Sequence, residues 1–159
     1  MQVIEKDFTT ITEGVVAHQV NCMGYMGCGA ALAIRKKWPA AYERYKVYGK
    51  KTGNGTLKPG MIQMIKVGNN LWVANLAGQD NIGRTRRMTD YEALETCLKK
   101  MSLWHLQRLA EHYEGKTVQI PVYFPYGMGC HNAGADWAVV EPMIVKYFPD
   151  AVFCKWIKD

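Results

Sequence analysis

Two glycine-rich stretches of this chain carry residue types that suit the binding of an anionic ligand. Each follows an apolar run and precedes a helix-like segment: NCMGYMGCGA at residues 21–30 and PYGMGCHNAGAD at residues 125–136. Glycine lets the backbone turn tightly and approach a ligand closely. The backbone N–H groups freed in such a corner, together with the following helix N-terminus, favour an anion. We therefore predict that the two corners close around a diphosphate.

A third polar segment, NLAGQDNIGR at residues 75–84, follows another apolar strand. Ligands of α/β proteins bind at the carboxyl ends of strands, so three polar segments after three strands indicate one site. The first corner is not a P-loop, because no lysine ends it, and it lacks the spacing of the dinucleotide fingerprint. Within the third segment Arg84 has the chemistry to reach a phosphate, although a solvated surface arginine explains it equally well.

The hydrophobic pattern predicts the elements that must position these segments. Strands are expected at residues 2–5, 14–20, 61–67, 71–76, 117–124 and 151–156. Helices are expected at residues 29–37, 40–48, 90–113 and 136–147. Residues 68–70, Gly-Asn-Asn, predict a hairpin between the third and fourth strands, whereas the other connections run through helices. This mixture predicts an α/β fold with a mixed sheet and helices on both faces.

The amino-acid composition is typical of a soluble globular protein. The chain has 159 residues, of which 48% are hydrophobic and 21% charged, which suits a single domain over residues 1–159. The beginning, MQVIEKDFTT, lacks the blocks of a signal peptide, and no apolar run is long enough to span a bilayer. We therefore expect a cytoplasmic protein without a membrane partner.

The charge and the cysteines narrow the chemistry further. The formal net charge of +6 fits an anionic partner, whether a nucleotide or a nucleic acid. Five cysteines at irregular spacing argue against a disulfide framework.

Three blocks of the sequence together resemble the macro domain, a module that binds ADP-ribose. They are HQVNCMGYMGCGAALAI at residues 18–34, parts of residues 74–94 around ANLAGQD and TDYEAL, and GCHNAGADW at residues 129–137. The resemblance covers nearly the whole chain. It is closest to the branch that contains yeast-type ADP-ribose 1''-phosphate phosphatases and de-ADP-ribosylating enzymes of the terminal ADP-ribose glycohydrolase kind.

The resemblance implies a three-layer α/β/α fold, with a mixed six-stranded sheet between helices and ADP-ribose in a cleft across the strand ends. Asp7 resembles the acid that hydrogen-bonds the adenine amine, and Asn21 the asparagine near the distal ribose. The implied ligand-binding set is Asp7, Asn21, Met26, Gly27, Cys28, Gly29, Gln79, Tyr126, Gly127, Met128, Gly129, Cys130, His131 and Asn132.

The chain departs from the pattern of the de-ADP-ribosylating branch. Gln79 occupies the position of that branch's lysine, and Ala133 that of its aspartate. Glutamine cannot form a Schiff-base-like adduct with an opened ribose, which disfavours the lysine mechanism. His18 matches a histidine of the phosphatase-like branch, where it would act as acid or base, although it could also simply hydrogen-bond within its strand. Asp80 could orient a water or cap its loop.

The favoured function is therefore binding of ADP-ribose or a derivative and hydrolysis of ADP-ribose 1''-phosphate, with His18, Asn21 and Asp80 as catalytic candidates. The alternatives are a non-catalytic ADP-ribose reader and a de-ADP-ribosylating hydrolase, and the partner could also be an ADP-ribosylated macromolecule. Nucleic-acid binding is less favoured, although Arg84, Arg86 and Arg87 cluster, because most aromatic residues occupy core-like positions and residues 35–46 are typical of the solvated face of a helix pair. Zinc is disfavoured, because close cysteine pairs are missing. No cofactor is required.

Overall fold

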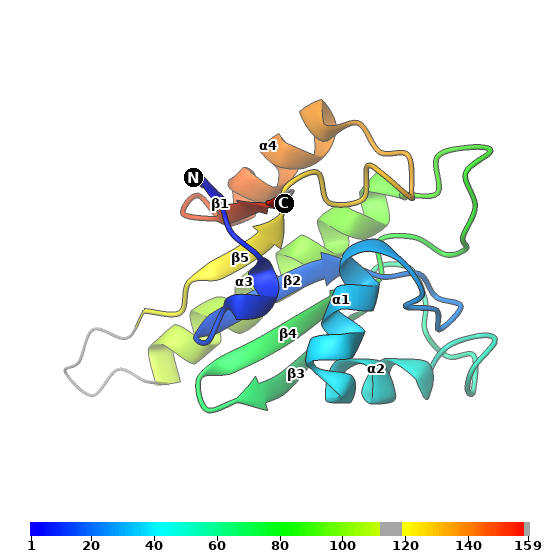
Figure 1. The fold of residues 1–159 in the computed structure, drawn as a ribbon, viewed down its shortest axis with the longest axis horizontal. Coiled ribbons are helices and arrows are strands. Elements are labelled where there is room, and N and C mark those ends of the chain that lie inside the picture. Colours follow the sequence, from blue (N-terminus) through cyan, green and yellow to red (C-terminus); the bar gives the residue numbers. More distant parts are fainter. Residues whose placement is uncertain (112–118, 158–159) are drawn as a thin grey trace.

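The chain folds into a central sheet covered by helices on both faces (Figure 1). The computed structural model describes residues 1–111 and 119–157. The strands are β1 (Gln2–Glu5), β2 (Gly14–Gln19), β3 (Ile62–Gly68), β4 (Leu71–Leu76), β5 (Val122–Pro125) and β6 (Val152–Lys155). The helices are the 3-10 helix η1 (Phe8–Thr10), α1 (Gly29–Lys37), α2 (Pro39–Lys46), α3 (Tyr91–Glu111) and α4 (Trp137–Tyr147).

The sheet has six strands in the order β1-β6-β5-β2-β4-β3. All neighbouring pairs are parallel except β3 and β4, which form the predicted antiparallel hairpin. The parallel strands β2, β4 and β5 therefore end at the same edge. The three segments that follow them are brought together there by the topology.

The two faces of the sheet bury different side chains of the same strands. Val15 and Ala17 of β2 pack in the core that α3 and α4 cover, whereas Val16 packs with Ile34 of α1. All six residues of β4 are buried. A central parallel strand covered on both faces reads as a continuous apolar run, which is the pattern that residues 14–20 and 71–76 show.

Local chemistry determines where the helices begin and end. The carboxylate of Asp90 accepts a hydrogen bond from the Ala93 N–H at the start of α3, and Asp136 caps α4 through the Ala138 N–H. Helix α1 ends before Trp38, because the residue that precedes a proline is disfavoured in a helix. Pro39 then begins α2, where its missing N–H costs nothing.

The predicted three-layer α/β/α fold with a mixed six-stranded sheet is confirmed, and most elements differ from expectation by one or two residues. The larger difference is β5, which begins at Val122 rather than residue 117. Residues 119–121 are not in a strand, and residues 117 and 118 lie outside the described ranges, as does the predicted end of α3 at residue 113. The helix η1 was not predicted; Asp7 caps it by accepting hydrogen bonds from the backbone N–H and the hydroxyl of Thr9.

Helix α3 provides a test of the packing. Leu98 is fully buried against the sheet, whereas Leu103 on the same helix is 60% exposed. Leu98→Ala is expected to lower the free energy of unfolding by about 2–5 kcal/mol, because it leaves a cavity. Leu103→Ala should change it by less than about 0.5 kcal/mol. Urea unfolding measures both, and equal effects would contradict the buried face assigned to α3.

Candidate functional site

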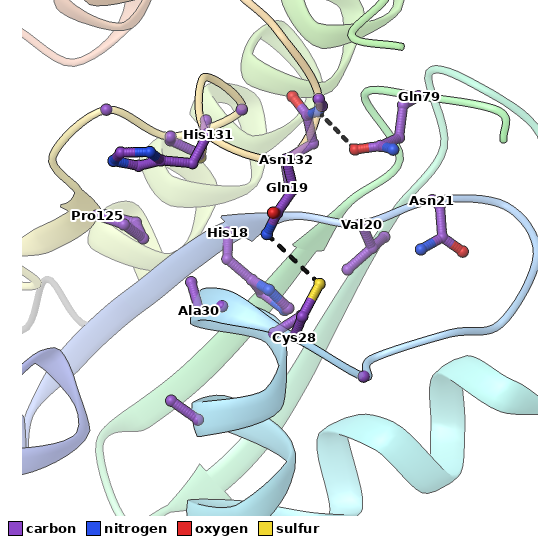
Figure 2. A pocket seen from close by; sticks show the side chains of 18 of the residues that line it. His18, Gln19, Val20, Asn21, Cys28, Ala30, Gln79, Pro125, His131 and Asn132 are labelled. Carbon is purple, nitrogen blue, oxygen red and sulfur yellow. Dashed lines mark hydrogen bonds between the residues drawn. The ribbon is translucent and has the colours of Figure 1, made fainter. Parts of the chain in front are cut away.

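A cleft of about 910 Å³ lies at the edge of the sheet where β2, β4 and β5 end (Figure 2). Its walls come from η1, the end of β2 with the first glycine corner, the segments after β4 and β5, and the end of β6. The first glycine corner runs directly into α1, whose first backbone N–H groups have no partner within the helix. The cleft therefore has the predicted combination of two glycine corners and a helix N-terminus.

Most of the predicted site residues line this cleft. These are His18, Asn21, Gly27, Cys28, Gly29, Gln79, Tyr126, Gly127, Met128, Gly129, His131 and Asn132. The residues found outside its lining are Asp7, Met26, Asp80 and Cys130. Ala133, which occupies the position of the de-ADP-ribosylating branch's aspartate, also lines it.

The Asn21 amide organises the first glycine corner. Its Oδ1 accepts hydrogen bonds from the backbone N–H groups of Met23, Gly24 and Tyr25, at 3.0, 3.2 and 3.3 Å. Its Nδ2 donates to the Tyr25 carbonyl at 2.9 Å. The buried Tyr45 hydroxyl lies 2.6 Å from the Asn21 carbonyl and 2.8 Å from its Oδ1, and desolvation raises the pKa of this phenol. Asn21 thus holds the corner in shape with the polar atoms of its side chain.

His18 is buried in the wall of the cleft, on the face of β2 that Val16 shares. Its Nε2 lies 2.6 Å from Oδ1 of Asn75. Because Nδ2 of Asn75 donates to the Ala41 carbonyl and to Oε1 of Gln63, Oδ1 must be the acceptor and His18 the donor. The proton therefore resides on Nε2, and Nδ1 is a buried acceptor that has no partner in the described part of the chain.

Burial also determines the charge of His18. Desolvation lowers the pKa of the imidazole to about 4, and the hydrogen bond to Asn75 only partly opposes it. The ring is therefore neutral at physiological pH. In this state it accepts a proton or a hydrogen bond through Nδ1 but does not act as an acid.

A second amide cluster ties the three segments together. Nε2 of Gln19 donates to Oε1 of Gln79 and to the Thr89 hydroxyl, both at 2.9 Å. The Thr89 hydroxyl donates to the Gly129 carbonyl at 3.0 Å, and Nε2 of Gln79 donates to the Asn81 carbonyl at 2.8 Å. Figure 2 shows Gln19 reaching from the end of β2 toward Gln79. Both ends of the Gln79 amide are consequently engaged.

Gln19 and Thr89 were not predicted as site residues. The glycines that lie against them are the sequence signal that could have indicated them. A Cβ at Gly78 or at Gly129 would lie 2.8 Å from Oε1 of Gln19. Only glycine fits at these two positions while Gln19 keeps its place.

Asp80 lies beside the cleft rather than in its lining. Its carboxylate forms an ion pair with Lys50, and its backbone carbonyl accepts the Cys22 N–H at 2.9 Å. The ion pair raises the pKa of Lys50 through the hydrogen bond to Asp80. In this structure Asp80 therefore joins the segment after β4 to residues 49–53.

Aromatic rings form one end of the cleft. Phe8 and Trp156 line it and meet edge to face, with ring centroids 6.2 Å apart. Tyr126 also lines it, and the Lys155 ammonium lies 4.4 Å from the centre of its ring. A flat heteroaromatic ring fits such a surface. Phe8 and Trp156 were not predicted, because they are far apart in sequence and only the fold brings them together.

The described residues contain no group of three or more His, Cys, Asp and Glu side chains that could hold a metal ion. None of the helices in the described ranges is long and apolar enough to cross a membrane. The cysteines in these ranges are all free thiols, and Cys28, at the N-cap of α1, is exposed.

Comparison with solved structures identifies the fold. A protein of unknown function from Bacteroides thetaiotaomicron superimposes with a TM-score of 0.80 at 27% identity, over 97% of this chain and 96% of that one. A macrodomain protein from Streptomyces coelicolor gives 0.73 at 26% identity, over 99% of both chains. DarTG of Thermosipho africanus in complex with ADP-ribose gives 0.68 at 18% identity, over 98% of this chain and 41% of that one.

No family model matches the chain, and no curated protein matches it. The solved structures nevertheless show that the chain has the macrodomain fold, as its resemblance implied.

The buried histidine leads to a prediction about pH. Because the folded-state pKa of His18 lies below the unfolded value, the unfolded state binds more protons between about pH 6.5 and 4. His18 should therefore contribute stability above pH 6.5 and lose up to about 3 kcal/mol of it as the pH falls toward 4. Nitrogen-15 NMR of the imidazole at pH 5.5 should find a neutral ring protonated on Nε2. A midpoint near 6.5, or a proton on Nδ1, would contradict the assigned hydrogen bond.

Proposed function

We propose that this chain binds ADP-ribose or a derivative of it in the cleft at the carboxyl ends of β2, β4 and β5. The observation that carries the proposal is the pair of glycine corners, which line one cleft beside the N-terminus of α1. The macrodomain fold supports it, as does the bound ADP-ribose of the Thermosipho africanus structure. The ligand's three parts then correspond to three regions of the cleft.

The adenine occupies the aromatic end. Phe8 and Trp156 offer faces and edges on which a purine stacks, and Tyr126 lies under the Lys155 ammonium. Asp7, immediately before Phe8, remains the predicted partner of the adenine amine. In the structure its Oδ1 accepts the hydrogen bonds of Thr9 that cap η1.

The diphosphate lies between the glycine corners. Backbone N–H groups at residues 27–29 and at Gly127, Gly129, His131 and Asn132 are the donors, reinforced by the helix dipole of α1. These groups are held in place before the ligand arrives, by Asn21 on one side and by Thr89 and Gln19 on the other. Preorganised donors bind an anion without the cost of ordering the loops.

The distal ribose lies beyond the diphosphate, near Asn21 and Gln79. The Gln79 amide is engaged at both ends, and no lysine lines this part of the cleft among the described residues. A lysine adduct with the opened ribose is therefore not the favoured chemistry. Asn21 shapes the surface against which the ribose packs.

A second function, hydrolysis of ADP-ribose 1''-phosphate, is favoured by His18, which lines the cleft and whose buried Nδ1 has no hydrogen-bond partner among the described residues. Water attacks the terminal phosphorus, its proton passes to Nδ1, and the bond between phosphorus and the 1'' oxygen breaks. The proton then passes from His18 to the departing ribose oxygen, which leaves ADP-ribose and inorganic phosphate. A neutral imidazole with its proton on Nε2 is the form that this step requires.

Gly27 offers a direct test of binding in the cleft. It lines the cleft, and a Cβ built there meets nothing within 4 Å, so a methyl group at this position has room in the folded chain. Wild-type protein should bind ADP-ribose in the micromolar range, about −8 kcal/mol, and AMP much more weakly. Gly27→Glu should weaken ADP-ribose binding at least 100-fold by placing a carboxylate beside the diphosphate, and Gly27→Ala by less than fivefold.

Calorimetric titration measures these affinities, and an unchanged melting temperature confirms that both variants fold. Equal binding by the wild type and by Gly27→Glu would place the ligand elsewhere. Binding of AMP as strong as that of ADP-ribose would contradict the diphosphate site.

Phosphate release from ADP-ribose 1''-phosphate tests the second function. His18→Gln is expected to lower kcat by about 100-fold or more, because the base is lost, while the affinity for ADP-ribose changes by less than threefold. Release at the wild-type rate would remove His18 from the mechanism and leave binding intact. If the wild type releases no phosphate but binds ADP-ribose, the chain is a reader.

A further inference from the structure

We infer that Arg84 is a ligand-contacting residue, which closes over the diphosphate from the segment after β4 and is positioned by Asn132. This inference rests on the proposed function and adds to it a cationic side chain, where the glycine corners supply only backbone donors. The observation that carries it is a relay of side chains, Arg84 to Asn132 to Cys28, that joins all three segments across the cleft.

Arg84 is exposed and lines the cleft together with Ile82 and Gly83. Its Nη2 donates to Oδ1 of Asn132 at 2.9 Å. Asn132 belongs to the second glycine corner, which the proposed function assigns to the diphosphate.

The contact between Arg84 and Asn132 continues to the opposite glycine corner. Nδ2 of Asn132 donates to Sγ of Cys28 at 3.4 Å, and Figure 2 shows this contact reaching from one corner to the other. A thiol is a weak acceptor, so the contact is readily exchanged for a charged oxygen. A diphosphate that lies between the corners would take the place of the sulfur as a partner.

The charges of the residues that line the cleft also favour Arg84 as the partner of an anion. The formally charged residues in the lining of the cleft are Arg84 and Lys155, and its lining contains no Asp or Glu. Lys155 lies over Tyr126 at the aromatic end, which leaves Arg84 as the counter-charge for the two phosphates. No ion pair between described residues involves Arg84.

The guanidinium of Arg84 keeps N–H donors that a ligand can use. Asn132 uses one of its five N–H donors, and the planar fork can present two others to phosphate oxygens. Asn132 fixes the orientation of the fork and so acts as a positioning residue. A pyrophosphate suits this combination, because its oxygens can accept from the backbone N–H groups of the glycine corners and from the arginine fork together.

The chain contains a matched control for this inference. Arg86 belongs to the same loop and is exposed, but it is not in the lining of the cleft. Arg84→Gln and Arg86→Gln remove the same charge from the same segment, so long-range electrostatics should affect both alike. A difference between them reports direct contact.

The experiment is calorimetric titration of wild type, Arg84→Gln, Arg84→Lys and Arg86→Gln with ADP-ribose and with adenosine. Arg84→Gln should weaken ADP-ribose binding by about 10- to 100-fold, which corresponds to the loss of a charge-assisted hydrogen bond, and adenosine binding by less than twofold. Arg86→Gln should change both by less than twofold. Arg84→Lys should recover part of the loss, because it keeps the charge and loses the fork.

Asn132→Ala tests the positioning role separately. It should weaken ADP-ribose binding less than Arg84→Gln does, and the double variant should lose less binding free energy than the two single variants added together, because part of the effect of Asn132 passes through the Arg84 guanidinium. If the wild type binds ADP-ribose but Arg84→Gln and Arg86→Gln bind it equally well, the inference is overturned and the proposed function survives. If the wild type does not bind ADP-ribose, the proposed function itself fails.

Discussion

The cleft depends on one constraint, the fit of the Gln19 carboxamide between Gly78 and Gly129. A single methyl group at either glycine would lie 2.8 Å from Oε1 of Gln19. With glycine at both positions, the amide reaches Gln79 and Thr89, and through Thr89 the carbonyl of Gly129. The end of β2 is thereby joined to the segments after β4 and β5 by side-chain hydrogen bonds.

Side-chain amides carry out the same task elsewhere around the cleft. Asn21 holds three successive backbone N–H groups of the first corner, and Asn75 holds His18 while bonding the backbone of α2. Irregular backbone near a buried strand end needs such partners, because unsatisfied polar groups there are costly. The bonds that stabilise the first corner use the N–H groups of Met23, Gly24 and Tyr25, so the proposed anion site depends on those of residues 27–29.

Much of the fold could be predicted because its signals are local. The apolar runs of β2 and β4 and the turn at residues 68–70 are each contained in a few neighbouring residues. The start of β5 was the least accurate boundary. There Pro121 follows an apolar residue and interrupts a run that composition alone would extend.

The contacts that build the site could not be predicted in the same way. The glycine corners were found from sequence, but Gln19 meets Thr89 across 70 positions and Arg84 meets Asn132 across 48. The orientation of His18 was also open, because β2 is buried on both faces and alternation does not distinguish them. Asp80 was expected in the site, and its pairing with Lys50 depends on a loop 30 residues away.

The central claim is that ADP-ribose lies between the two glycine corners, and backbone amide NMR during titration with ADP-ribose tests it most directly. The account predicts the largest shift changes at Gly27, Cys28 and Gly29 and at residues 127–132, with smaller changes at Phe8 and Trp156. No shift changes, or changes confined to the groove beside His105 and Phe148 at the other end of the sheet, would contradict it.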